Sequence, residues 1–170
     1  FWATGACLFV RSSHFWEVCG LDEDFFAHQE EIDLCWRLKN NGSKIMVEPK
    51  SVVYHVGGGT LDAVSPFKTH LNFRNNLYML FKNLPVTSLF VVIPMRLVLD
   101  GVAALTFLNK EKGLEHVLAI AKAHFSFYFA IPNLISKRQK INQKNSLVGK
   151  MYWSILVKNK MNGINRFSEL

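Results

Sequence analysis

The sequence predicts an α/β fold over residues 1–66, followed by a helical, basic and apolar region over residues 67–170. In the first part, short apolar runs rich in β-forming residues alternate with helical patterns, which is typical of an α/β unit. The second part has long apolar stretches with helical spacing, bordered by lysine and arginine. We therefore expect two regions of different character in one chain.

Three segments of the first part predict strands. ACLFVR (6–11) is a short apolar run, and SKIMVEP (43–49) and KSVVYHV (50–56) are extended segments separated by Pro49. The last of them leads into Gly57-Gly58-Gly59, where the backbone is free to turn or to approach a ligand closely.

Two helices are predicted between these strands. SSHFWEVCG (12–20) begins with serines that favour a helix start and ends with a glycine. The second helix, from about His28 to Asn41, has apolar residues three and four positions apart and ends before Gly42.

Three further helical segments are predicted in the second part. The first covers 69–85 and ends at Pro85, and the last begins near residue 114. Between them, residues 88–108 are almost wholly apolar and near the ~20 residues of a membrane span. Arg96 and Asp100 interrupt this stretch four residues apart, so they lie on one face and can pair. This favours an interfacial or protein-covered helix over a lipid-bathed span.

The net charge of +7 belongs to the second half. Residues 1–85 hold 8 Lys/Arg and 9 Asp/Glu (8 − 9 = −1), whereas residues 86–170 hold 12 and 4 (12 − 4 = +8). Such asymmetry indicates an anionic partner. An anionic membrane surface is favoured over nucleic acid, because the aromatic residues lie in apolar helices and not on a basic face. The three cysteines, an odd number without a CxxC motif, argue against a disulfide framework or a zinc site.

The stretch FFAHQEEIDLCWRLKNNG (25–42) places Glu30, Glu31 and Asp33 at a helix start. Carboxylates in a first turn offset the helix dipole, so a merely capped helix is one interpretation. Two adjacent carboxylates also repel each other, which favours one of them as a general base. His55, at the end of the last predicted strand, can converge on the same pocket, whereas a structural histidine is the alternative.

Residues 4–60 resemble the acceptor-side half of bacterial family 2 glycosyltransferases, which have the GT-A fold. The family pattern has Gly-Ala before an apolar strand and Arg, a G-[FL]-D-E-x-F-F loop, an E-D-x-D-L-x-x-R helix, a Gly, and a strand that ends in His. The matching residues here are Gly5-Ala6, Arg11, Gly20-Leu21-Asp22-Glu23, Phe25-Phe26, Glu30-Glu31, Asp33-Leu34, Arg37, Gly42 and His55. NFRNNLYMLFKN (72–83) also looks like a downstream Arg-Asn helix of bacterial members.

The resemblance implies a role for several residues. The second acid of the pair, Glu31, would deprotonate the acceptor hydroxyl in an inverting transfer, with Glu30 and Asp33 shaping that base and binding acceptor hydroxyls. Glu31 stands where the family usually has Asp, so either Glu31 or Glu30 can be the base. His55 would join a divalent cation, Mn²⁺ or Mg²⁺. We expect Trp2, Gly5 and Arg74 either to contribute to the acceptor pocket or to be packing residues.

The resemblance also implies the partners. The donor would be a nucleotide sugar, and the acceptor a glycan or a lipid-linked sugar of cell-envelope polysaccharide synthesis at the cytoplasmic face of the inner membrane. We expect the donor-binding half, with its Asp-x-Asp motif and most of the metal ligands, to be missing, which would leave this fragment inactive alone. The alternative is a non-catalytic membrane-associated or binding module whose acidic helix is only capped.

Overall fold

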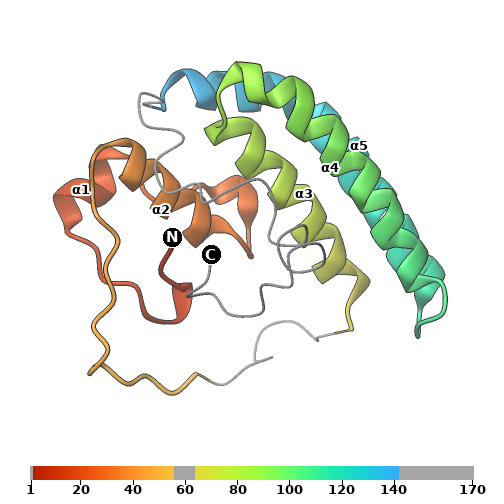
Figure 1. The fold of residues 1–170 in the computed structure, drawn as a ribbon, viewed down its shortest axis with the longest axis horizontal. Coiled ribbons are helices and arrows are strands. Elements are labelled where there is room, and N and C mark those ends of the chain that lie inside the picture. Colours follow the sequence, from red (N-terminus) through yellow and green to blue (C-terminus); the bar gives the residue numbers. More distant parts are fainter. Residues whose placement is uncertain (1, 56–63, 142–170) are drawn as a thin grey trace, which may run out of the picture.

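The computed structural model describes residues 2–55 and 64–141. The expected glycine turn at 57–59 and the basic and aromatic segment after residue 141 lie outside these residues. The described chain consists of helices and 3₁₀ turns joined by loops, and a long loop runs from residue 41 to residue 55 (Figure 1). The elements are the 3₁₀ turns η1 (Gly5–Cys7) and η2 (Glu23–Phe25) and the helices α1 (Ser12–Glu17), α2 (Glu30–Asn40), α3 (Pro66–Asn83), α4 (Val86–Phe107) and α5 (Gly113–Gln139).

The prediction of an α/β fold, and with it the GT-A fold, is wrong: residues 2–55 and 64–141 contain helices and no strand. Part of the expected strand 6–11 is the η1 turn, and residues 43–55 have no regular structure. A β-forming segment becomes a strand only beside a partner that completes its backbone hydrogen bonds. No such partner lies in the described chain, and the side chains of Met46, Val47 and Tyr54 are exposed.

The helices predicted in both parts are confirmed, with small shifts at their ends. α3 lies at the centre of the arrangement, in contact with α2 on one side and with α4 and α5 on the other (Figure 1). Its apolar side supplies Leu77, Tyr78 and Met79 to the core, which α2 completes with Trp36 and η2 with Phe25. Phe127 and Leu134 close this core from α5.

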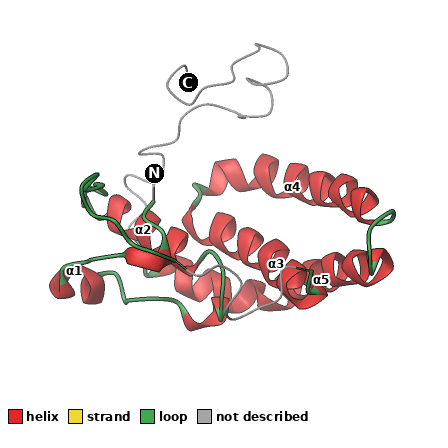
Figure 2. Cartoon of the chain, turned by 90° about the horizontal axis from the view of Figure 1, so that it is seen from below, coloured by secondary structure: helices red, strands yellow, loops and turns green. Residues whose placement is uncertain are grey.

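α4 and α5 form a long antiparallel hairpin beside α3 (Figures 1 and 2). Pro94 lies inside α4 without ending it. The predicted pair on this helix is confirmed, because Arg96 Nε lies 2.7 Å from Asp100 Oδ1. Asp100 is buried, and His124 of α5 lies 3.1 Å from its other oxygen. This ion pair therefore faces the inside of the hairpin.

Candidate functional site

The start of α2 carries the two glutamates that the sequence singled out. Glu30 and Glu31 are the first residues of the helix, and both are partly buried. In each of them the carboxylate oxygen Oε2 is buried and has no hydrogen-bond partner in the described part of the chain. The residue before them, Gln29, makes no side-chain capping bond. Buried polar atoms are ordinarily hydrogen-bonded, so this helix start has acceptor capacity that its own fold does not use.

The backbone that leads into α2 is strained. Phe26, His28 and Gln29 have φ angles of 62°, 68° and 70°, although none of them is glycine. Phe26, with ψ of −57°, also lies outside the left-handed helical region. Such conformations cost about 1–3 kcal/mol each, and they persist only where the surrounding structure imposes them.

Asn75 of α3 holds this segment. Its side chain is fully buried. Its Nδ2 group donates hydrogen bonds to three backbone carbonyl oxygens, those of Phe25 at 2.9 Å, Ala27 at 2.7 Å and His28 at 2.8 Å. These three contacts cover Phe26 and His28, two of the three residues of this segment with positive φ.

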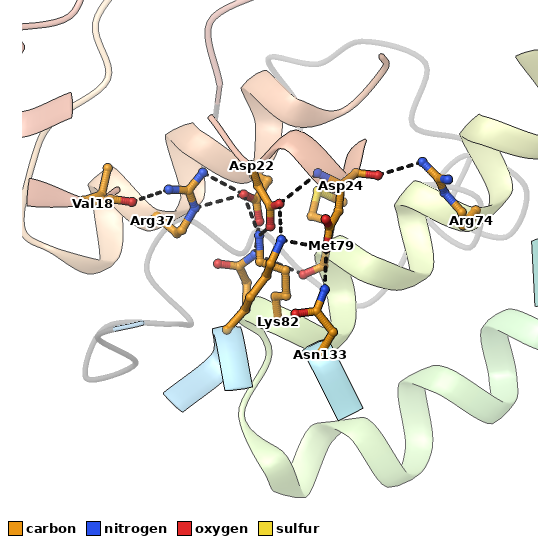
Figure 3. A network of polar contacts seen from close by, with 11 residues as sticks. Val18, Asp22, Asp24, Arg37, Arg74, Met79, Lys82 and Asn133 are labelled. Atoms are coloured by element: carbon orange, nitrogen blue, oxygen red, sulfur yellow. Dashed lines mark hydrogen bonds and ion pairs between the residues drawn. The ribbon is translucent and has the colours of Figure 1, made fainter. Parts of the chain in front are cut away.

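Arg74, the neighbour of Asn75, extends the same contact. Its Nη2 group donates to the carbonyl oxygen of Asp24 at 2.8 Å (Figure 3) and to that of Phe25 at 3.1 Å. On the other side of the segment, Gln29 Nε2 donates to the carbonyl oxygen of Asn72 at 3.0 Å. The guanidinium of Arg74, which was expected from the sequence either in the acceptor pocket or in packing, binds the loop before α2.

The N-terminal segment packs against the face of α2 that bears Glu31. A Cβ atom on Gly5 would lie 3.8 Å from the Cβ of Glu31, so these two predicted site residues are neighbours. One turn further along α2, the backbone of Ala3 bonds the thiol of Cys35. Burial raises the pKa of this thiol, and the negative charge of Glu31 adds to the rise against the opposing Ala3 bond. Trp2, beside this segment, is half-exposed.

Asp33, the third acid of α2, is fully buried and belongs to an ionic network with Arg37 and Lys82, which Figure 3 labels. Arg37 Nε donates to its Oδ2 at 2.9 Å, and Lys82 of α3 donates to the same oxygen at 3.0 Å. Asn83 Nδ2 donates to Oδ1 at 2.7 Å. Arg37 also donates to the carbonyl oxygen of Val18. Both carboxylate oxygens of Asp33 are therefore bound by side chains of the protein.

The network continues to the loop before η2 and to α5. Lys82 Nζ and Lys137 Nζ each lie 2.5 Å from an oxygen of Asp22. Although burial raises the pKa of Asp22, the charge of Lys82 and hydrogen bonds from both lysines and from the Asp24 backbone hold it at about 2. Lys137 and Asn133 also bind the carboxylate of Asp24, at 2.6 and 2.7 Å. This loop is thus fastened to α3 and to α5.

An open hollow of about 540 Å³ lies beside this network and is lined by Asp22, Asp24, Lys82 and Lys137, among others. Glu30, Glu31 and His55 do not line it. Its acidic and basic side chains are largely paired with each other, which leaves no surplus of one charge for a ligand.

His55 is exposed and ends the first described segment. No contact to the glutamates of α2 is seen for it. No group of three or more His, Cys, Asp or Glu residues that could hold a metal ion occurs within residues 2–55 and 64–141. The described residues therefore do not supply a metal site, and the roles of His55 and of Mn²⁺ or Mg²⁺ stay predictions.

The α4–α5 hairpin exposes many large apolar side chains. α4 and α5 are each long and apolar enough to cross a membrane, and only 6% of the most apolar part of α4 is buried. Helices of soluble cores also reach such lengths and compositions, but they are mostly buried. A groove of about 690 Å³ runs between them, lined by Leu89, Ile93, Phe127 and Ile131 with other apolar residues.

On α3, sequence reasoning identified Arg74 but missed the buried polar residues Asn75 and Lys82. Asn75, Tyr78, Met79 and Lys82 follow one another at i, i+3, i+4 and i+7, so they share one helix face. An asparagine and a lysine on an otherwise apolar face indicate buried polar groups with partners elsewhere in the fold. This spacing is the sequence feature from which the buried Asn75 and Lys82 could have been predicted.

The chain is similar to a known sugar transferase over part of its length. It is 41% identical over 54 residues to N-acetylglucosaminyl-diphospho-decaprenol L-rhamnosyltransferase from two strains of Mycobacterium tuberculosis, CDC 1551 / Oshkosh and H37Rv. The match covers 32% of this chain and 18% of the length of each relative. No family model matches the chain, and no solved structure matches it. The similarity supports sugar transfer in general.

Proposed function

We propose that this chain is the acceptor-side part of a glycosyltransferase that moves a sugar, with inversion, from a nucleotide sugar to a hydroxyl group of a lipid-linked glycan. The observation that carries the proposal is the start of α2, where two adjacent glutamates each keep a buried carboxylate oxygen without a partner. Strained backbone immediately before them supports a functional role, because such strain gathers at active sites.

Glu31 is the proposed general base, and Glu30 is the alternative. One carboxylate takes the proton of the acceptor hydroxyl, and the resulting oxygen attacks the anomeric carbon of the donor. The new C–O bond forms as the bond from that carbon to the diphosphate breaks, and the nucleoside diphosphate leaves with the electron pair. Gly5 supports Glu31 as the base, because a residue without a side chain beside it leaves room for an acceptor.

The rest of the predicted site takes different parts. Asp33 has both oxygens bound by the protein, so we propose that it holds α2 in place and does not contact the acceptor. Trp2 is half-exposed and directly precedes Ala3, which contacts α2, so Trp2 remains the proposed acceptor contact.

The name of the M. tuberculosis relatives suggests the substrates to try first. We propose an L-rhamnosyl nucleotide as donor and an amino sugar linked through diphosphate to a polyprenol as acceptor. Both follow from a match that covers 18% of those relatives.

The test is sugar transfer by the full-length protein and its Glu31→Gln and Glu30→Gln variants. Loss of the general base is expected to lower kcat by about 10²–10⁴-fold while donor binding stays unchanged. Glu17→Gln, an exposed glutamate at the end of α1, is the matched control. Normal turnover by both α2 variants would contradict the proposed base and would favour a non-catalytic module.

We propose that the α4–α5 hairpin attaches the protein to the anionic cytoplasmic face of the membrane, where lipid-linked acceptors lie. Support comes from exposed apolar residues along the hairpin, such as Phe90, Val98 and Phe129, and from Lys110 and Lys112 at its turn. Phe90→Asp with Val98→Asp should abolish flotation with vesicles that contain anionic lipid. Phe9→Asp, at an even more exposed residue outside the hairpin, should not. Flotation that survives the hairpin change, or a preference for an oligonucleotide, would contradict this attachment.

A further inference from the structure

The contact between α3 and residues 25–29 is made by side-chain hydrogen bonds to the backbone and not only by apolar packing. One buried carboxamide, that of Asn75, meets three carbonyl oxygens, and carbonyl oxygens accept hydrogen bonds but donate none. Its own oxygen accepts a hydrogen bond from Arg74 Nε at 2.9 Å. Every polar atom of the Asn75 side chain is therefore engaged, and its orientation is fixed.

The segment that Asn75 holds is also the strained one. Two of the three carbonyl groups belong to Ala27 and His28, and positive φ occurs at Phe26, His28 and Gln29. A backbone in ordinary φ/ψ regions keeps its conformation without such contacts, whereas a strained backbone relaxes when the contacts are lost. Glu30 follows directly, so the direction in which α2 starts depends on this contact.

We infer that Asn75 is a positioning residue, which fixes residues 25–29 and thereby sets where the carboxylates of Glu30 and Glu31 point during sugar transfer. The inference rests on the function proposed above. Arg74 supports the same segment from its first residues, through the carbonyl groups of Asp24 and Phe25. Neither side chain has to touch the substrate to act in this way.

The chain provides a matched control on the same helix. Asn83 is as fully buried as Asn75. It donates to Asp33 and to the carbonyl oxygen of Met79, and none of its hydrogen bonds reaches residues 25–29. Replacing Asn83 by alanine therefore removes a comparable buried amide without releasing the segment before α2.

The first measurement compares sugar transfer by the Asn75→Ala and Asn83→Ala variants of the full-length protein. Asn75→Ala is expected to lower kcat by about 100-fold, the order of loss for a displaced catalytic group, with the KM for the nucleotide sugar unchanged. Asn83→Ala frees only Oδ1 of Asp33, whose Oδ2 keeps Arg37 and Lys82, so it is expected to lower kcat much less than Asn75→Ala once activity is scaled to the folded fraction. An equal loss of kcat in the two variants would overturn the inference.

The second measurement does not depend on activity. Amide hydrogen exchange at residues 26–31 should be faster in Asn75→Ala than in Asn83→Ala, with the amides of Leu77 as the reference for global opening. Arg74→Lys, which keeps the charge but loses the planar fork, is a milder variant and should accelerate the same amides. Unchanged exchange at residues 26–31 in the Asn75 and Arg74 variants would overturn the positioning role. Absence of any transfer by the wild-type protein would instead defeat the proposed function, and the exchange data would still decide about Asn75.

Discussion

Lys82 Nζ lies 3.0 Å from Asp33 Oδ2, and the two side chains are 2% and 0% exposed. Lys82 comes from α3 and Asp33 from α2, so this ion pair joins the central helix to the helix that bears the candidate base. The same ammonium group binds Asp22 at 2.5 Å. One buried cation therefore binds two carboxylates, that of the fully buried Asp33 and that of the largely buried Asp22.

Lys82→Met should strongly destabilise the protein. Methionine fills a similar volume but removes the cation that Asp33 and Asp22 share. Arg37 and Lys137 still bind these carboxylates, so the cost is expected at the lower end of the ~3–5 kcal/mol of a broken buried pair. Urea unfolding measures the loss. Lys122→Met, at an exposed lysine of α5, is the control and should stay within about 0.5 kcal/mol of the wild type. A small effect at Lys82 would mean that the network is not held together by this charge.

Acid should weaken the fold through Asp22. Its pKa is lowered from 3.8 to about 2, so the stabilisation is complete above the unfolded-state value and is lost as the pH falls from about 4 to about 2. The loss is on the order of 2 kcal/mol for this group. The measurement is the free energy of unfolding against pH for the wild type and for Asp22→Asn. The difference between the two curves should shrink over this window, and a constant difference would contradict the assignment.

The turn between α4 and α5 should require glycine at position 113. A Cβ atom there would lie 2.3 Å from the carbonyl oxygen of Phe107 and 2.8 Å from that of Leu108, both in the backbone. Gly113→Ala is therefore expected to cost about 1–3 kcal/mol, as overpacked sites do. Gly101→Ala is the control, because nothing lies within 4 Å of a Cβ there and alanine favours a helix by about 1 kcal/mol. Thermal unfolding should move the two variants in opposite directions.

Asp100→Asn should loosen the hairpin. The buried carboxylate binds Arg96 on its own helix and His124 on α5, and an amide cannot match both interactions. Limited proteolysis near residues 108–112 is expected to speed up relative to the wild type. Thr106→Ala, which removes a local bond to the Ala103 carbonyl oxygen, should not have this effect. Equal cleavage rates would show that the ion pair does not hold α4 on α5.

The helices could be predicted from the sequence because their signals are local. Periodic apolar residues, Gly42 after α2 and the spacing of Arg96 and Asp100 all act within one element. The prediction of strands was wrong for the opposite reason. Residues 43–55 form a strand only beside a partner strand, and the local sequence pattern does not show whether such a partner is present.

The candidate site was predictable to the same extent. The acidic helix start was found from its residue types, and its neighbour Gly5 from the family resemblance. The contacts that hold it, from Asn75 and Lys82, join residues about 50 positions apart in the chain. Sequence spacing along one helix can show that such side chains are buried, but it does not show which partner they meet.

The loop at Asp22 and Asp24 has a mechanical consequence. Lys137 and Asn133 of α5 bind the carboxylates of Asp22 and Asp24. The strained segment that leads to Glu30 begins directly after these residues. A shift of α5 is therefore expected to move the acidic helix start, because α5 binds this loop directly.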